Sequence, residues 1–279
     1  MIDIAIIGGG PAGLSAAINA AQRNKKVTVF GRGIETSMLY KAEKVDNYIG
    51  MPDITGKKML EDFLSHAVSK GVEIKHNKVY QIFKTGDFFT LNADNNFIEA
   101  KKVIIASGIE KGKPMKGEKE LVGRGVSYCA TCDGMLYRNK DVAMIADSES
   151  AEEDLKFLSE ICSKVYFIPL YKYKGAAYDN VEIINKKPLG VIGENVVKGL
   201  SFGDMTISCK GVFIIKESVP VTSLIDGIEL ENGAIRVNRQ MQTSVEGIYA
   251  AGDCTGAPFQ ISKAVGEGLV AALNAVKEL

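Results

Sequence analysis

Apolar residues at the start of the chain form a continuous run that ends at a glycine. Residues 2–7, IDIAII, predict a buried strand, and Gly8 follows directly. Residues 11–24 are rich in alanine and predict a helix with small side chains on one face, and residues 26–30 predict a second strand. A strand, a glycine turn, a helix and another strand in this order predict the opening of a doubly wound parallel sheet.

The next part of the chain continues this pattern and then loses it. Residues 56–70 carry apolar side chains at helical spacing, and short strands are predicted near residues 72–76, 79–84, 88–92 and 97–106, where we expect a small antiparallel layer. Residues 109–125 lack apolar periodicity and are rich in glycine. We therefore expect the chain to cross into a second domain there.

A second strand, helix and strand series follows at residues 141–146, 150–162 and 164–168, and it predicts a second sheet. The pattern breaks again near Pro220, and residues 235–279 supply further strands and a last helix. We predict an α/β protein with two doubly wound, Rossmann-like three-layer domains, the second inserted into the first. The expected first domain comprises residues 1–110 and 221–279, and the second comprises residues 111–220.

Composition and charge narrow the class of protein. Lys and Arg number 34, and Asp and Glu also number 34, so no net charge favours nucleic acid or an anionic membrane as the main partner. No apolar run approaches the roughly 18 residues of a membrane helix, and a chain that begins MIDIAIIGGG leaves no room for a signal peptide. Five cysteines do not fit a secreted disulfide framework. We expect a cytoplasmic protein that binds neither nucleic acid nor membrane.

The first glycine cluster has the spacing of a dinucleotide-binding turn. Gly8, Gly10 and Gly13 stand in GGGPAG between a predicted strand and a predicted helix. In such a turn the first glycine permits the tight bend, the second lets the backbone approach a pyrophosphate, and the third allows close helix packing. The alternative is a glycine turn with only a structural role.

A second candidate lies near the end of the chain, in TSVEGIYAAGD at residues 243–253. A strand that ends in Gly-Asp can place the Asp253 carboxylate where it accepts a hydrogen bond from a polyol hydroxyl, and the following helix begins near the same point. Alternatively, Asp253 only caps the last helix.

A third candidate is the segment Cys129-Ala130-Thr131-Cys132-Asp133. Two thiols at this spacing can form a disulfide in a tight turn, and a following helix N-terminus stabilises a thiolate. A zinc half-site needs two further ligands, but the other cysteines and histidines are scattered without ligand spacing. The pair could also be buried and inert.

These motifs together resemble a known family. GGGPAG and TSVEGIYAAGD resemble the FAD domain of the flavin disulfide reductases, and Cys-Ala-Thr-Cys-Asp is similar to the active site of low-molecular-weight thioredoxin reductases. The resemblance covers nearly the whole chain and implies domains of the FAD/NAD(P)-binding type, FAD as cofactor, thioredoxin as substrate and a homodimer. It assigns the FAD contacts to Gly8, Gly10, Pro11, Ala12, Gly13, Asn47, Val79, Ala106, Gly108, Gly252, Asp253, Gln260 and Ile261.

The resemblance also implies catalytic roles. Cys132 lies against the flavin, and Cys129 exchanges with the thioredoxin disulfide. Asp133 is the nearby acid or base, although it could equally be only a helix-end carboxylate. No residue is assigned to a metal.

Two features of the family are missing from the second predicted domain. The segment at residues 146–151, ADSESA, replaces the glycine turn that binds NADPH, and residues 169–172, PLYK, replace a His-Arg-Arg cluster for its 2′-phosphate. Acidic residues crowd the position of the pyrophosphate and repel it, although they also suit a solvated helix surface. In the first domain, an acid that would bind ribose is absent, since Arg32 stands near that point.

The missing motifs change the expected electron donor. The chain resembles the ferredoxin-dependent flavin thioredoxin reductases, which keep the FAD domain and the cysteine pair, so we expect reduced ferredoxin as donor. The alternatives are another donor to the same reductase, such as a reduced deazaflavin coenzyme or NAD(P)H, and a non-catalytic flavoprotein redox sensor. A lysine-rich stretch at residues 101–125, which includes Lys111 and Lys113, is a candidate docking surface for an acidic ferredoxin.

Overall fold

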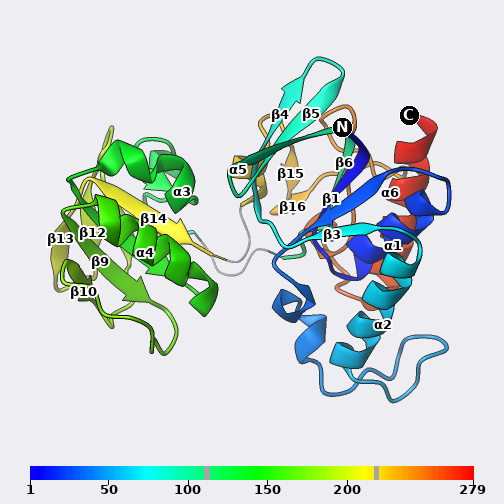
Figure 1. Ribbon diagram of the computed structural model, residues 1–279, viewed down its shortest axis with the longest axis horizontal. Helices are drawn as coiled ribbons and strands as arrows, with labels where there is room; N and C mark the ends of the chain where they lie inside the picture. The colour runs from blue at the N-terminus through cyan, green and yellow to red at the C-terminus, as the bar shows by residue number, and fades with distance from the viewer. Residues whose placement is uncertain (110–113, 217–219) are drawn as a thin grey trace. The chain divides into compact units, whose positions relative to one another are not determined.

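The computed structural model describes residues 1–109, 114–216 and 220–279, and the chain forms two compact units. Unit 1 comprises residues 1–110 and 218–279, and unit 2 comprises residues 111–217. Figure 1 shows unit 1 with both chain ends and unit 2 as the middle of the chain.

Unit 1 is built around one mixed sheet of seven strands. Its elements are β1 (Ile2–Ile7), α1 (Pro11–Ala21), β2 (Val27–Phe30), α2 (Gly56–Ser69), β3 (Glu73–Lys75), β4 (Val79–Thr85), β5 (Phe88–Ala93), β6 (Asn96–Ile105), α5 (Val221–Leu224), β17 (Ile248–Ala250) and α6 (Ile261–Lys277), with a small hairpin of β15 (Leu230–Glu231) and β16 (Ala234–Ile235). Most lie within a few residues of the predicted elements. Helix α1 ends earlier than predicted, and Asn24 adopts a left-handed φ of 58° in the turn beyond it.

The sheet order is β3-β2-β1-β6-β5-β4, and β17 pairs with β6 outside this path. The first half of β6 pairs antiparallel with β5, whereas its second half pairs parallel with β1 and β17. The expected antiparallel layer therefore consists of β4, β5 and part of β6. Strand β3 instead extends the parallel part beside β2, because the intervening helix α2 returns the chain to run in the same direction.

Alternation along β1 separates two apolar cores. Ile4 and Ile6 pack with α1, α2 and α6 on one face of the sheet, and Ala5 and Ile7 pack with the β4–β5 hairpin on the other. The parallel strands are buried on both faces, which is why their sequences read as unbroken apolar runs.

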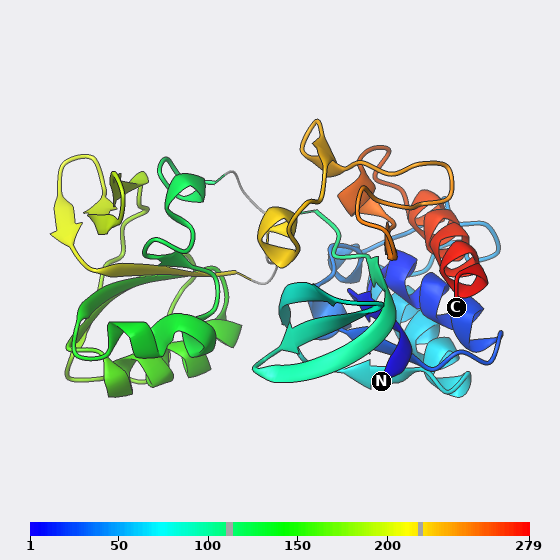
Figure 2. The same ribbon diagram turned by 90° about the horizontal axis from the view of Figure 1, so that it is seen from above.

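Unit 2 has a five-stranded sheet of order β10-β9-β8-β14-β7, in which every pairing is parallel. Its elements are β7 (Val126–Ser127), α3 (Ala130–Asp133), β8 (Asp141–Ala146), α4 (Glu152–Ile161), β9 (Lys164–Pro169), β10 (Val181–Ile183), β11 (Gly190–Gly193), β12 (Val197–Ser201), β13 (Thr206–Ser208) and β14 (Gly211–Ile215). Figures 1 and 2 show α3 and α4 on one face of this sheet and the small β11–β13 sheet on the other. The prediction of two Rossmann-like three-layer domains is confirmed.

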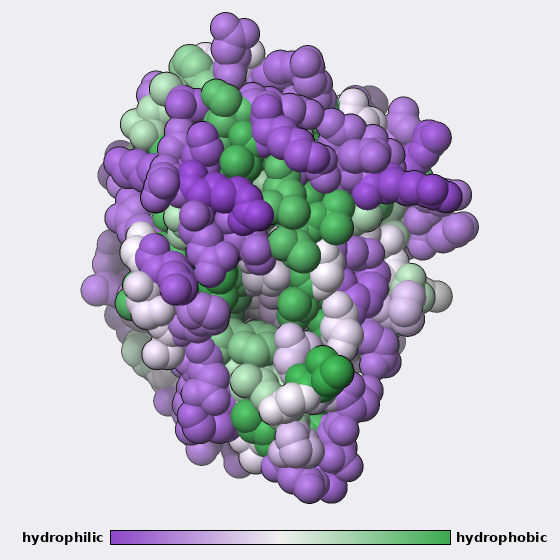
Figure 3. Space-filling view, turned by 90° about the vertical axis from the view of Figure 1, so that its right-hand side faces the viewer, coloured by the Kyte–Doolittle hydropathy of each residue, from purple (hydrophilic) through white to green (hydrophobic). Residues whose placement is uncertain are grey.

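The surface of unit 1 is not uniformly polar. On the face seen in Figure 3, apolar side chains gather around a central hollow, and polar side chains form the rim. Among the described residues, no helix is both long and apolar enough to cross a membrane.

The turn after β1 depends on close backbone contact. Gly8 has a φ of 113°, and a Cβ atom there would lie 2.2 Å from the carbonyl oxygen of Ala106. A Cβ on Gly13 would lie 1.9 Å from the carbonyl oxygen of Gly8. Glycine is therefore required at both positions for β1, α1 and the end of β6 to approach one another.

Substitution of two nearby glycines should affect the stability of the protein to very different degrees. We expect Gly8→Ala to lower the free energy of unfolding of the FAD-free protein by about 2–4 kcal/mol, because it adds a clash and a strained φ. Gly10→Ala is the matched control, since Gly10 has a negative φ and nothing lies within 4 Å of an added Cβ. Its stability should change by less than about 1 kcal/mol. Urea unfolding checks this, and equal stability of the two variants would contradict the packing argument.

Candidate active site

Three parallel strand ends form the candidate cofactor cradle of unit 1. Strands β1, β6 and β17 lie side by side, so the loops after their carboxyl ends meet at one edge of the sheet. The Gly8 turn packs on the backbone of Ala106, as described above. A Cβ on Gly252 would lie 2.8 Å from the Cβ of Ala12, so the loop after β17 packs on the first turn of α1.

The N-terminus of α1 provides backbone donors without a side chain in front of them. Gly10 is the N-cap residue and supplies no side-chain hydrogen bond, and Pro11 has no N–H to satisfy. The N–H groups of Ala12 and Gly13 belong to the first helical turn, where intrahelical partners are absent. The open space at Gly10 and these donors fit a dinucleotide diphosphate.

Asp253 begins a short turn, Asp253–Thr255, directly after β17. Burial raises the pKa of Asp253, the charge of Lys263 lowers it, and the charge of Glu267 raises it further. A half-buried carboxylate at this position can accept a hydrogen bond from a ligand hydroxyl, which compensates for its lost hydration. The backbone N–H donors of α1 and the Asp253 acceptor therefore fit a flavin dinucleotide.

The structure brings together two predicted flavin contacts that are 213 positions apart. The side-chain amide of Asn47 donates a hydrogen bond of 3.1 Å to the side-chain oxygen of Gln260. Both side chains are exposed, and Gln260 is the N-cap residue of α6, which begins at Ile261. The pair remains accessible to a ligand at this point of unit 1.

Two other predicted FAD contacts are placed differently. Gly108 follows Ala106 with a φ of 72° and nothing within 4 Å of its missing Cβ, so the backbone there is open to a ligand. The side chain of Val79 belongs to the apolar core and is only 4% exposed. A contact between Val79 and FAD therefore has to come from its backbone.

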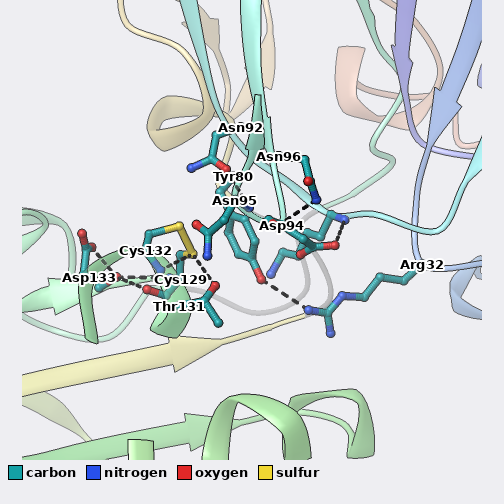
Figure 4. The surroundings of a disulfide bond; sticks show 12 residues. Arg32, Tyr80, Asn92, Asp94, Asn95, Asn96, Cys129, Thr131, Cys132 and Asp133 are labelled. Atoms are coloured by element: carbon teal, nitrogen blue, oxygen red, sulfur yellow. Dashed lines mark hydrogen bonds between the residues drawn. A yellow bond between two sulfur atoms is a disulfide. The ribbon is translucent and has the colours of Figure 1, made fainter. Parts of the chain in front are cut away.

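The sequence alone indicates no role for the side chain of Arg32, which stands near the point where a ribose-binding acid is absent. Its guanidinium donates a hydrogen bond of 3.3 Å to the hydroxyl of Tyr80, as Figure 4 shows. The ammonium of Lys78 lies 4.8 Å from the centre of the Tyr80 ring. Two cations and an aromatic ring thus adjoin in unit 1, where Lys78 and Tyr80 are buried and Arg32 is partly exposed.

In unit 2, Cys129 and Cys132 are joined by a disulfide bond. Cys129 is the N-cap residue of α3, and its sulfur accepts a hydrogen bond of 3.1 Å from the Cys132 N–H. The hydroxyl of Thr131 lies 3.5 Å from the same sulfur (Figure 4). These polar groups would stabilise negative charge on Cys129 when the bond is reduced.

Ser127 connects the disulfide segment to Asp133, a role that the motif alone did not reveal. Its hydroxyl lies 2.7 Å from a carboxylate oxygen of Asp133 and 3.1 Å from the carbonyl oxygen of Cys129. The Cys129 N–H in turn donates to the Ser127 hydroxyl at 3.1 Å. Because Ser127 lies in β7 and Asp133 ends α3, the contact fixes the carboxylate beside the cysteine turn.

A buried carboxylate also stabilises the disulfide segment. Glu118 is fully buried and accepts hydrogen bonds from the Met115 N–H at 2.8 Å and the Tyr128 hydroxyl at 3.1 Å. The ammonium of Lys216 lies 3.6 Å from it. Since Tyr128 directly precedes Cys129, this cluster fixes the start of the disulfide segment.

Unit 2 is acidic at the edge of its sheet where a Rossmann-like domain would bind a nucleotide. A 3₁₀ turn at Glu149–Ala151 follows β8 in place of a glycine turn, and the first turn of α4 carries Glu152, Glu153 and Asp154. Negative charges at a helix N-terminus occupy the position that an anionic ligand would otherwise take.

Aromatic side chains also cover this edge. Tyr171 and Tyr173 follow β9, and the ring of Tyr173 lies 5.0 Å from that of Phe167 and 6.3 Å from that of Tyr171. Burial, and then the charge of Glu152, raise the pKa of Tyr171 to about 12. The Tyr173 hydroxyl donates to the Ala176 carbonyl at 2.6 Å, which folds the segment onto itself. The chain's own side chains therefore fill space beside the β8 turn.

A dinucleotide cradle in one unit and a bonded cysteine pair in the other define the class of flavin-linked disulfide oxidoreductases. A family model described as pyridine nucleotide-disulphide oxidoreductase matches residues 2–149 and 175–268, and the chain belongs to this family. The match omits residues 150–174, which include α4 and the segment with Tyr171 and Tyr173.

Individual relatives agree with this assignment. The thioredoxin reductase of Bacillus subtilis (strain 168) is 32% identical, and the match covers 97% of this chain and 92% of the relative. A crystal structure of a ferredoxin-flavin thioredoxin reductase from Clostridium acetobutylicum is 46% identical with a TM-score of 0.89, covering 99% of this chain and 96% of that chain. A thioredoxin reductase from Gloeobacter violaceus is 28% identical with a TM-score of 0.83, covering 99% and 93%.

The expectation of a flavin-type disulfide oxidoreductase is thus confirmed, with FAD as its cofactor. Unit 1 supplies the residues that would hold FAD, and unit 2 supplies the disulfide. The bond between Cys129 and Cys132 agrees with the disulfide that their spacing predicts.

The three other cysteines should not react with thiol reagents in the native protein. Burial raises the pKa of Cys162 to about 11 and that of Cys209 and Cys254 to about 12. At pH 8 a thiol of pKa 11 is only about 0.1% thiolate, the reactive form. Titration with an aromatic disulfide reagent should find no fast thiol in the oxidised protein and two after reduction. A fast thiol in the oxidised protein would contradict this assignment.

Proposed function

We propose that the protein is a flavin-dependent thioredoxin reductase that takes electrons from reduced ferredoxin and passes them through FAD and the Cys129–Cys132 disulfide to thioredoxin. One observation carries the choice of donor: unit 1 keeps the FAD cradle, whereas unit 2 has acidic and aromatic side chains at its nucleotide edge. The similarity to the Clostridium acetobutylicum enzyme supports the same donor and substrate.

The nucleotide edge of unit 2 argues against NADPH on two independent grounds. Glu149 and Glu152 would repel a diphosphate, and Tyr171 and Tyr173 occupy space beside the turn. NADPH donates a hydride, so its nicotinamide has to be bound in a position where it stacks on the flavin. A one-electron donor needs only close approach, so the loss of the nucleotide site does not impair it.

The energetics favour ferredoxin. Plant-type ferredoxins have reduction potentials near −400 mV, and thioredoxin has a potential near −270 mV. Two electrons that fall through about 130 mV release about 6 kcal/mol. FAD supplies the conversion between one-electron and two-electron chemistry, because it accepts electrons singly and delivers them in pairs.

The cysteines then carry the exchange with the substrate. Reduction of their disulfide by two electrons and two protons gives two thiols, and we assign Cys132 to the flavin side. Cys129, as thiolate, attacks the disulfide of thioredoxin and forms a mixed disulfide. Cys132 then attacks the Cys129 sulfur, which releases reduced thioredoxin and restores the disulfide bond of the enzyme.

Asp133 is assigned to proton transfer during these steps. Its carboxylate is held by the Ser127 hydroxyl at 2.7 Å and ends the same short helix that carries Cys132. A carboxylate fixed beside the cysteine turn can take the proton of a thiol and return it to the leaving sulfur.

The homodimer and the cytoplasmic location expected from the sequence are part of this proposal, and light scattering tests the first. The lysine-rich docking stretch receives less support. Lys101 pairs with Asp3 at 2.8 Å and Lys102 with Glu278 at 3.1 Å, so both charges are partly compensated. Lys111 and Lys113 lie outside the described residues.

The donor can be tested by anaerobic stopped-flow mixing. We expect reduced ferredoxin to bleach the absorbance of the bound flavin, whereas NADPH and NADH do not, because acidic side chains stand where unit 2 would bind their diphosphate. The ferredoxin rate should fall as salt rises if docking is electrostatic. Rapid bleaching by stoichiometric NADPH with none by ferredoxin would overturn the choice of donor, and a reduced deazaflavin is included in the panel for the same reason.

Cysteine variants can separate the two half-reactions. Cys129→Ser should leave flavin reduction by ferredoxin intact but lower thioredoxin reduction by at least about a thousandfold, because the attacking sulfur is lost. Cys132→Ser should have the same effect on turnover. Cys162→Ala is the matched control, since this free cysteine of unit 2 has no assigned role. Turnover by a variant that lacks both Cys129 and Cys132 would contradict the mechanism.

A further inference from the structure

The first turns of α6 hold the loop that follows β17. The Lys263 ammonium donates hydrogen bonds to the carbonyl oxygens of Gly252 at 2.8 Å and Gly256 at 2.6 Å, and to the Thr255 hydroxyl at 2.9 Å. An ammonium has three donors, and all three are used within this one loop. Lys263 therefore ties the two ends of residues 252–256 together.

Glu267, one helical turn further along α6, binds the same loop. Its carboxylate accepts a hydrogen bond of 2.8 Å from the Gly252 N–H and lies 2.8 Å from the Thr255 hydroxyl. It also lies 3.2 Å from the Lys263 ammonium. An ordinary lysine–glutamate pair on a helix surface remains in water. Here both side chains are mostly buried, with exposed fractions of 16% and 20%, and both contact the backbone of another segment.

Glycines stand at both ends of this loop, where the backbone adopts angles that other residues rarely take. Gly252 has a φ of 88° and Gly256 a φ of 104°, so both ends adopt the left-handed region. A Cβ on Gly268 of α6 would lie 2.1 Å from the Ala12 carbonyl oxygen, so α6 itself packs closely on the first turn of α1. The loop, α6 and the Gly8–Gly13 turn therefore form one packed assembly in unit 1.

We propose that Lys263 and Glu267 are positioning residues for the cofactor, which hold the loop at residues 252–256 so that Asp253 and the N-terminus of α1 face the same bound FAD. This inference rests on the proposed function, in which unit 1 holds FAD and the Asp253 carboxylate accepts a hydrogen bond from it. Burial raises the pKa of Asp253 and the charge of Glu267 adds to this rise, whereas the charge of Lys263 opposes it and so favours the ionised, accepting form of the carboxylate. Neither residue contacts the reacting atoms in this role.

The affinity of the FAD-free protein for FAD tests the proposal without any measurement of turnover. FAD is removed, and the dissociation constant is measured by quenching of flavin fluorescence. Lys263→Met should raise it at least about tenfold, since charge-assisted hydrogen bonds to both ends of the loop are lost. Lys263→Gln, whose amide still donates, should raise it less. Lys277→Met is the control, because Lys277 is an exposed lysine in the last turn of the same helix.

Two further variants distinguish positioning from general destabilisation. If Lys263 acts through the loop that carries Asp253, then Lys263→Met should weaken FAD binding less in an Asp253→Asn background than alone. Glu267→Gln should show the same non-additivity. Urea unfolding of each FAD-free variant accompanies the titration, and Lys263→Gln serves if Lys263→Met does not fold.

The outcomes separate this inference from the proposed function. If Lys263→Met and Lys263→Gln bind FAD within twofold of the unaltered protein, the positioning role is wrong and the reductase proposal stands. Full additivity with Asp253→Asn would likewise exclude action through the loop. If the unaltered FAD-free protein binds no FAD, the role of Asp253 and the reductase proposal fail together.

Discussion

The close approach of three parallel strand ends in unit 1 is the constraint on which the cofactor cradle depends. Gly8 must come within contact of the Ala106 backbone, and Gly252 must fit against Ala12, before the N-terminus of α1 and Asp253 can meet at one edge. Backbone at this distance leaves no room for a Cβ. The glycines therefore shape the cradle, and the groups that would bind FAD there are backbone N–H groups and the Asp253 carboxylate.

Unit 2 shows how a similar strand and helix series can serve another purpose. Its parallel sheet keeps the order that would place a nucleotide after β8, but acidic groups and the Tyr171–Tyr173 pair stand at that edge. At the end of β7, by contrast, Ser127, Cys129 and Asp133 form a polar cluster around the disulfide. Unit 2 thus keeps the cysteine pair, whereas the edge at which a nucleotide would bind differs from that of the family. The family match omits residues 150–174, which lie at this edge.

Ionic groups that are buried or mostly buried stabilise both the FAD cradle and the disulfide segment. Lys263 and Glu267 bind the loop of Asp253, and Glu118 binds Tyr128 next to Cys129. Lys263 and Glu267 are compensated by hydrogen bonds to one loop, and Glu118 is compensated by the Met115 N–H, the Tyr128 hydroxyl and the Lys216 ammonium. Loss of a single hydrogen bond in such a cluster leaves a buried polar group unsatisfied, which disfavours other arrangements of the loop.

The sequence by itself determined the α/β class, the strand–turn–helix at Gly8–Gly13 and the cysteine pair, because these depend on local periodicity and on residues a few positions apart. Strand β3 was misplaced in an antiparallel layer, since pairing direction depends on where a crossover helix returns the chain. Only the tertiary structure brought Asn47 to Gln260, Arg32 to Tyr80 and Ser127 to the Asp133 carboxylate. Hydrogen bonds of this kind join side chains whose distance and direction are fixed by packing, which no local pattern encodes.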